Sequence, residues 1–223
     1  MPKTWDVKRK TTKYILRPHP GSHTIDSSMP IQIFLRDVLK VAKTAKEVRY
    51  ILNDKEVLVN GKKRKDVKFP VGLMDVVEIP ELKKSYRILF NHKGKITTTE
   101  MKDAEKSIKP FKIKNKSIVT KGKIQLNFED GTNLIVEKDT YKTNDVILYD
   151  FKAGKITKHI VFENNALAYL TGGNKVGITG TLEDIKDNNI ILKSQKGEVF
   201  ETSKKFAFVI GKTKPEITLP DEK

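Results

Sequence analysis

The sequence contains no cysteine, which excludes disulfides, zinc sites built on thiolates and cysteine nucleophiles. It also has no long apolar run, so no segment approaches the roughly 20 residues that a membrane-spanning helix needs. The first 23 residues are too polar to act as a secretory signal peptide. From these absences we expect a cytoplasmic protein with no membrane partner.

Signatures of catalysis and of cofactor binding are missing as well. The segment "GKT" at 211–213 is preceded by Phe206 where a phosphate-binding P-loop requires glycine. His19 and His23 are four residues apart, but a proline and a glycine between them prevent the helical geometry of a shared metal site. Carboxylates such as those at 129–131 lie at predicted turns, where they suit hairpin chemistry. We therefore expect no enzyme, no cofactor, no metal and no small-molecule substrate.

The charge of the chain is strongly positive. Lysine and arginine number 44 against 28 aspartates and glutamates, which gives a formal net charge of +16. A field of this sign attracts a polyanionic partner, either nucleic acid or an acidic membrane surface. We favour this interpretation over the alternative that the excess positive charge only keeps the protein soluble. Only six of the basic residues are arginine, so phosphates would be contacted mainly by lysine ammonium groups rather than by bidentate guanidinium groups.

Residues 1–30 form a basic segment with little hydrophobic periodicity, interrupted by prolines and a glycine. We interpret it as an extended N-terminal arm that does not pack as an element and that would be mobile in the free protein. Arg17, His19 and His23 are its candidate RNA-binding residues.

Residues 31–80 predict two helices followed by a hairpin and a further strand. Apolar residues in 31–43 recur at helical spacing, and the Thr44-x-x-Glu47 capping box starts a second helix. Asn60-Gly61 predicts a tight hairpin turn that is followed at once by four basic residues. The candidate RNA-binding residues of this region are basic and lie either on the outer faces of the two helices or directly after the turn. They are Arg36, Lys40, Lys43, Lys46, Arg49, Lys62, Lys63, Arg64 and Lys65.

The remainder of the chain predicts strands and turns almost throughout. Residues 81–166 are expected to form a central β-rich domain, and residues 167–223 a small closed β-barrel with a tail that frays after Gly211. The last region contains nine lysines and eight carboxylates, so it adds little long-range attraction. The glycines of "KVGITGT" (175–181) are expected where side chains would obstruct a turn or bend. The fold class is therefore α+β with several domains.

The order helix, helix, hairpin with "VLVNGKK" (57–63) resembles the small S4-type RNA-binding module. Four further segments, "LRPHPGSH" (16–23), "MPIQIFLRDVLKVAKTAKEVRYIL" (29–52), "VNGKKRKDVKFPVGLMDVVEI" (59–79) and "GGNKVGITG" (172–180), occur in the order seen in the S4e family of archaeal and eukaryotic small-subunit ribosomal proteins.

This resemblance spans nearly the whole chain. It implies an arm, an S4-like module, a central β domain and a C-terminal SH3-like KOW barrel, all serving to bind rRNA. The implied function is a non-catalytic structural constituent of the small ribosomal subunit, bound to 16S-type rRNA and neighbouring ribosomal proteins. No motif of the resemblance falls within residues 95–123.

Two other functions fit part of the pattern. An RNA-modifying enzyme could dock its substrate through an S4-like module, although about 140 residues after the module leave little room for a catalytic domain. A KOW-type partner of RNA polymerase or of a translation factor would instead use the nearly neutral barrel to bind protein.

Overall fold

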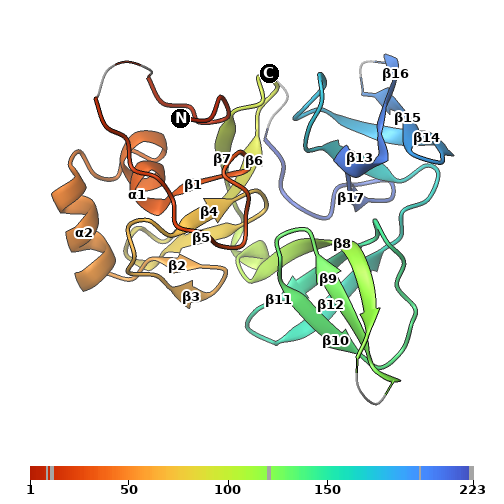
Figure 1. Cartoon of the computed structure of the whole chain (residues 1–223), viewed down its shortest axis with the longest axis horizontal. Helices are drawn as coiled ribbons and strands as arrows, with labels where there is room; N and C mark the ends of the chain where they lie inside the picture. Colours follow the sequence, from red (N-terminus) through yellow and green to blue (C-terminus); the bar gives the residue numbers. More distant parts are fainter. Residues whose placement is uncertain (9, 11–12, 120–121, 196, 221–223) are drawn as a thin grey trace. The chain divides into compact units, whose positions relative to one another are not determined.

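The structure, a computed structural model, describes every residue except 9, 11–12, 120–121, 196 and 221–223 (Figure 1). The chain divides into two compact units, unit 1 with Met1–Lys109 and Thr218–Lys223, and unit 2 with Pro110–Ile217. Strands predominate in both units, and both α-helices among the described residues belong to unit 1. The strand-rich α+β class that the sequence predicts is confirmed.

Unit 1 is built from one main sheet, a two-stranded sheet and short helices. The main sheet has the order β3-β2-β5-β6-β7, and β1 pairs separately with β4. The elements are β1 (Ser28–Pro30), α1 (Ile31–Ile33), the π-helical turn η1 (Phe34–Val38), α2 (Ala45–Asp54), β2 (Leu58–Val59), β3 (Lys62–Lys63), β4 (Pro70–Gly72), β5 (Val76–Ile79), the 3-10 turn η2 (Pro80–Leu82), β6 (Lys84–Phe90), β7 (Ile96–Glu100) and the 3-10 turn η3 (Asp103–Glu105).

The main sheet continues across the position where we expected one domain to end and the next to begin. The short turn η2 returns the chain directly from β5 into β6, and the two strands pair from Val76↔Arg87 to Ile79↔Lys84. Strands β6 and β7 therefore share a sheet with the hairpin of the expected 31–80 module, and residue 80 lies inside unit 1.

The first predicted helix is shorter than its apolar pattern suggests. Helical structure covers α1 and η1 only, and Lys40 adopts a left-handed conformation with φ of 56°. The Val41 amide then donates to the Leu35 carbonyl oxygen, which turns the chain out of the helix in the manner of a left-handed C-terminal cap. The polar residue Gln32 is buried in this helical segment.

The second helix and its start signal are confirmed. Thr44 is the N-cap of α2, and its hydroxyl oxygen accepts from the Glu47 amide at 3.2 Å. The Glu47 carboxylate in turn accepts from the Lys43 amide at 2.8 Å, so Thr44 and Glu47 cap the start of the helix from both sides. The buried side chains of Val48 and Leu52 hold one face of the helix against the unit.

The hairpin at Asn60-Gly61 is also confirmed. Both residues have positive φ, 52° and 74°, as a two-residue type I′ turn requires, and β2 pairs with β3 on either side. This turn presents Lys62 and Lys63 as the exposed strand β3.

The prediction of an arm that does not pack is wrong at several of its residues, including the buried strand β1 at its end. Trp5 is 3% exposed, and its indole Nε1 donates to the Ser28 carbonyl oxygen at 2.7 Å. The Thr4 carbonyl oxygen accepts from the Ile96 amide, which ties the segment to β7. His23 is buried as well, as described below. We overlooked a single apolar side chain because a lone tryptophan gives no periodic signal.

Unit 2 contains two five-stranded antiparallel sheets, ordered β10-β9-β8-β11-β12 and β16-β15-β14-β13-β17. Strands joined by turns fill this region, as the sequence predicts. They are β8 (Ile108–Ile118), which begins in unit 1, β9 (Ile124–Phe128), β10 (Asn133–Val136), β11 (Val146–Asp150), β12 (Lys155–Ile160), β13 (Leu167–Leu170), β14 (Thr179–Lys186), β15 (Asn189–Ser194), β16 (Val199–Ser203) and β17 (Ala207–Gly211), with the 3-10 turn η5 (Lys204–Phe206) before the last strand.

One face of the first sheet of unit 2 carries an aromatic core. Phe111 stacks on Phe128 with ring centroids 4.8 Å apart, and Ile113, Leu126 and Ile147 complete the cluster. Because side chains alternate along a strand, the residues between these face the other way.

The tail after Gly211 is more ordered than we expected. Gly211 bridges to Pro215, and Ile217 is 3% exposed. The Thr218 amide and hydroxyl both donate at 2.8 Å to the carboxylate of Glu105, which also pairs with the buried Arg87 in unit 1. The last three residues of the expected tail lie outside the described residues.

Candidate nucleic-acid interface

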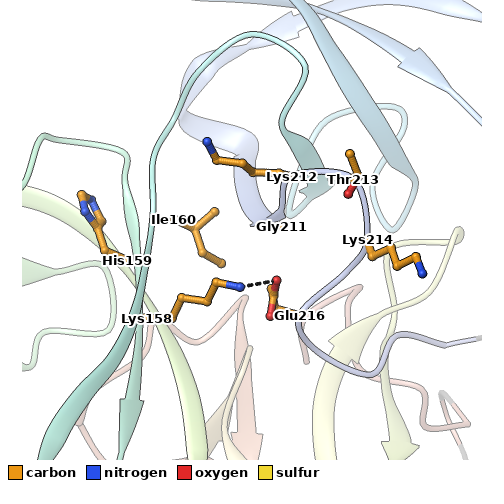
Figure 2. Close-up of a pocket in the computed structure, with 8 residues that line it drawn as sticks. All are labelled: Lys158, His159, Ile160, Gly211, Lys212, Thr213, Lys214 and Glu216. Atoms are coloured by element: carbon orange, nitrogen blue, oxygen red, sulfur yellow. Dashed lines mark hydrogen bonds and ion pairs between the residues drawn. The ribbon is translucent and has the colours of Figure 1, made fainter.

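A hollow of about 290 Å³ lies in unit 2 between β12 and the turn that follows β17 (Figure 2). Although three lysines line it, the charges inside it are balanced. Lys158 pairs with Glu216 at 2.6 Å, and Lys212 pairs with Glu163 at 2.6 Å. In Figure 2 the side chains of His159 and Lys214 point away from the centre, so no set of groups converges on a ligand.

The described residues provide no other obvious small-ligand or metal chemistry. No group of three or more metal-ligating side chains comes together among them. In the same part of the chain, no helix has the length and apolar character needed to cross a membrane. The exposed basic residues of unit 1 form the clearest candidate surface.

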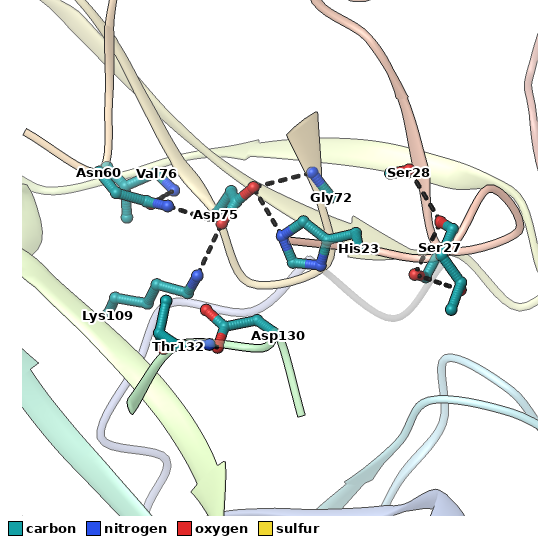
Figure 3. Close-up of polar contacts among 11 residues, drawn as sticks. His23, Ser27, Ser28, Asn60, Gly72, Asp75, Val76, Lys109, Asp130 and Thr132 are labelled. Carbon is teal, nitrogen blue, oxygen red and sulfur yellow. Dashed lines mark hydrogen bonds and ion pairs between the residues drawn. The ribbon is translucent and has the colours of Figure 1, made fainter. Parts of the chain in front are cut away.

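A buried polar network supports the hairpin that carries the densest of these charges (Figure 3). Its centre is Asp75, 1% exposed, whose Oδ1 accepts from Asn60 Nδ2 and from Lys109 Nζ, both at 2.7 Å. The other oxygen, Oδ2, contacts His23 Nε2 and the Gly72 amide, both at 2.9 Å. Asn60 completes the link, since its Oδ1 accepts from the backbone of β5. The network fixes the hairpin turn to the strand beneath it.

The ionisation of Asp75 depends on this network. Burial alone would raise the pKa of the carboxyl group, but the charge of Lys109, followed by the contacts of His23 and Asn60, outweighs burial and holds the pKa well below its usual range. Asp75 is therefore a carboxylate in the folded protein. Its role is structural, because every contact described is internal to unit 1.

The hairpin presents most of its basic residues to solvent. Lys62, Lys63 and Lys65 are exposed, and Lys63 has only a long contact of 3.5 Å with Glu56. Arg64 differs, since it is half-buried and its guanidinium carbon lies 4.3 Å from the centre of the Phe69 ring. Arg64 thus braces the hairpin by a cation–π contact.

Helix α2 and the segment before it add further exposed cations. Lys40, Lys43, Lys46 and Arg49 are all exposed, whereas Val48 of α2 is buried. We use the term basic face for the exposed cations of these two elements, which are Lys40, Lys43, Lys46, Arg49, Lys62, Lys63 and Lys65. Of these, Lys63 alone has an ion pair recorded within the described part of the chain.

Sequence reasoning overlooked an aromatic residue beside these cations. Tyr50 follows Arg49 on α2 and is 59% exposed. An exposed aromatic ring among cations is a potential stacking surface for a base. The sequence offered a signal, an aromatic residue between the apolar positions of an amphipathic helix, that we did not use.

The remaining candidate residues have mixed environments. Arg17 and His19 are exposed, and His19 lies 3.9 Å from Asp66. Arg36 is half-buried and donates from two guanidinium nitrogens to its neighbour Asp37. These donors are therefore already used in an internal ion pair. The His23 side chain is 6% exposed and bonded to Asp75 through Nε2, so it takes part in the internal network, and its contact with RNA stays a prediction.

Comparison with known proteins places this chain among small-subunit ribosomal proteins. The S4 domain matches residues 29–77, and the Ribosomal family S4e matches residues 82–156. Small ribosomal subunit protein eS4 of Methanocaldococcus jannaschii is 40% identical over 98% of this chain and 94% of its own length. The same-named protein of Archaeoglobus fulgidus is 41% identical over 95% of this chain and 90% of its own length.

A solved structure agrees with these sequence matches. The 30S ribosomal protein S4e from Thermoplasma acidophilum is 32% identical with a TM-score of 0.72, and the match covers 84% of this chain and 96% of that chain. The family is a structural, non-enzymatic one, which gives no support to the RNA-modifying alternative. The chain belongs to the ribosomal protein family S4e.

Proposed function

We propose that this protein is a non-catalytic structural constituent of the small ribosomal subunit, bound to small-subunit rRNA through the basic face. The observation that carries the proposal is the similarity, over nearly the full length, to proteins named small ribosomal subunit protein eS4. Its partners are the 16S-type rRNA and neighbouring proteins of the subunit. Its place is the ribosome in the cytoplasm.

The chemistry of the basic face supports RNA as the ligand. Most of its cations have no internal ion pair among the described residues, so they are available to phosphates. Six of its seven members are lysines, whose point charges suit the backbone rather than the bases. A-form RNA is recognised mainly through its shape, phosphates and ribose hydroxyls, which matches such a surface.

The local fold places the hairpin near the C-terminal end of α2, as a single basic face on these two elements requires. Helix α2 ends at Asp54 and β2 begins at Leu58, so three residues span the gap, at most roughly 14 Å. The Arg64 amide donates to the carbonyl oxygen of Val57 in this link, which joins the hairpin to it. The helix end and the hairpin therefore lie close together in unit 1.

We further propose that the second sheet of unit 2, β13 to β17, is the SH3-like KOW barrel of the family. Three features support this assignment. They are the strand order, the register shifts in the pairing of β13 with β17 and of β14 with β15, and the close approach of β14 to β15 at Gly180. Residues 167–223 contain nine lysines and eight carboxylates, so this part has almost no net charge with which to attract RNA. Its contribution is the shape of its fold.

Sedimentation of a cell lysate tests the proposal. The chain should migrate with the small subunit at near unit ratio in low salt and should dissociate as salt rises, because many lysine–phosphate contacts release counterions. A variant with Lys40, Lys43, Lys46 and Arg49 replaced by Gln should dissociate at lower salt than wild type. Migration of the chain with RNA polymerase, or with free protein at all salt concentrations, would contradict the proposal.

A further inference from the structure

Six neighbouring outward residues on the first sheet of unit 2 are uncharged, in a chain of which 32% of residues are charged. Strands β8, β9 and β10 place their outward residues in two rows. The first row aligns Asn115, Asn127 and Asn133, and the second aligns Ser117, Gln125 and Ile135. We call these six residues the amide face. The opposite side of the same strands carries the buried core.

Side chains on the amide face are ordered by a hydrogen-bond relay. Gln125 Nε2 donates to Asn127 Oδ1 at 2.7 Å, and Asn127 Nδ2 donates to Ser117 Oγ at 3.2 Å. Asn115 Oδ1 accepts from the Lys116 amide at 2.7 Å. The relay leaves the Ser117 proton and the carbonyl oxygen of Gln125 facing solvent, since the described residues supply them no recorded partner. The face is thus a prearranged set of donors and acceptors.

We infer that the amide face binds the shallow minor groove of an rRNA helix through ribose 2′-hydroxyls and base edges. This inference rests on the proposed function. The A-form minor groove is wide and shallow, and it presents neutral donors and acceptors that amides and hydroxyls complement. A face that contacted phosphates would instead carry lysine, which is abundant everywhere else in the chain.

The surroundings of the face agree with the groove rather than the backbone. By strand alternation, Lys123 and Glu137 continue the rows at the hairpin end, and Glu129 follows Asn127 at the other. One lysine and two carboxylates therefore border the neutral centre, and neither end offers the cluster of lysines that a phosphate contact would use. Ile135, 57% exposed, offers an apolar contact to a ribose ring. A protein partner is less well matched, because interface centres favour aromatic residues and this face has none.

The test measures binding of the full chain to transcribed small-subunit rRNA over a range of salt. The double variant Gln125→Ala, Asn127→Ala should lower the affinity about tenfold, as expected for two or three lost hydrogen bonds, and leave the log-log salt slope unchanged. Ribose footprinting should show the loss of one discrete set of protections. Thr157→Ala, exposed on β12 of the same sheet, is the matched control and should behave as wild type. Thermal melts establish that each variant is folded.

Three results would overturn the inference. The first is unchanged affinity of the double variant for bare rRNA. If that variant also failed to enter the subunit, the amide face would be a contact for a protein. A reduced salt slope would make it a phosphate contact. If the wild-type protein does not bind rRNA at all, the proposed function itself fails. This outcome can be distinguished from failure of the inference, because the variant Lys62→Ala, Lys63→Ala would then also leave rRNA binding unchanged.

Discussion

Gly180 offers a stringent test of how the second sheet of unit 2 is built. It pairs with Ala168 on β13 and with Ser194 on β15, so its backbone is enclosed on both sides. A Cβ atom added there would lie 2.8 Å from the Lys193 carbonyl oxygen and 3.2 Å from its carbonyl carbon. Both neighbours are backbone atoms within a strand, so they cannot rotate away as a side chain would.

Replacing Gly180 by valine should therefore force β14 and β15 apart locally. Inserting a side chain into packed structure typically costs about 1–3 kcal/mol. For a unit of this size the melting temperature of the affected transition should fall by roughly 5–10 °C. Affinity for rRNA should change little, because the region contains nearly equal numbers of lysines and carboxylates.

Differential scanning calorimetry of the full chain is the assay, with rRNA binding measured on the same samples. Thr181→Val is the matched control, because it changes the neighbouring residue on β14 at nearly constant volume and adds no Cβ. Melting of Gly180→Val within about 1 °C of wild type would refute the close-approach argument. Unchanged melting with lost RNA binding would make the glycine part of a contact site instead.

Four other predictions follow from unit 1. Lys62→Ala, Lys63→Ala should weaken rRNA binding and reduce the log-log salt slope by about one unit per lost phosphate contact, whereas an unchanged slope would mean that both side chains face solvent. Tyr50→Ala should cost about 1–3 kcal/mol of binding without altering the salt slope, while Tyr50→Phe should retain binding, and equal affinities of the two variants would exclude stacking. Asp75→Asn should destabilise unit 1 by about 3–5 kcal/mol in urea titrations at pH 7, since the buried Lys109 ammonium group loses its counter-charge. Because the folded pKa of Asp75 is depressed, its contribution is present above the unfolded pKa and is lost as pH falls through the folded pKa, so the gap between wild type and variant should narrow below about pH 4 and a constant gap would contradict the assignment. Trp5→Ala should release the N-terminal segment, so that trypsin cleaves it early in the variant but not in wild type, and early cleavage of both would show that the tryptophan does not anchor it.

Features with local causes were predictable from the sequence. The capping box at Thr44 and the turn at Asn60-Gly61 depend on residues within four positions of each other, and both form as expected. The alternating strands of unit 2 were predictable for the same reason, since side-chain alternation is a local property. The early end of the first helix was not, because Lys40 adopts a conformation that the sequence usually marks with glycine.

Features that depend on distant residues were not predictable. His23 meets Asp75 across 52 positions and Lys109 meets it across 34, so burial of the histidine has no trace in its own neighbourhood. The amide face likewise requires the register of three strands, although "NKS" and "QLN" already show its alternation in the sequence. Pairing of β6 with β5 was missed because a domain boundary inferred from a change in pattern contains no information on sheet order.

Directed cleavage of rRNA tests the central claim most directly. Because the chain contains no cysteine, a cleavage reagent can be attached at a single introduced cysteine and nowhere else. Single cysteines placed at Lys46 and at Lys62 would each carry a tethered iron chelate, and the cysteine-free chain would be the matched background. In assembled small subunits, we predict strong cuts in the small-subunit rRNA from both positions, at neighbouring or overlapping sites. Cleavage no stronger than the background from both positions would contradict binding of rRNA through the basic face.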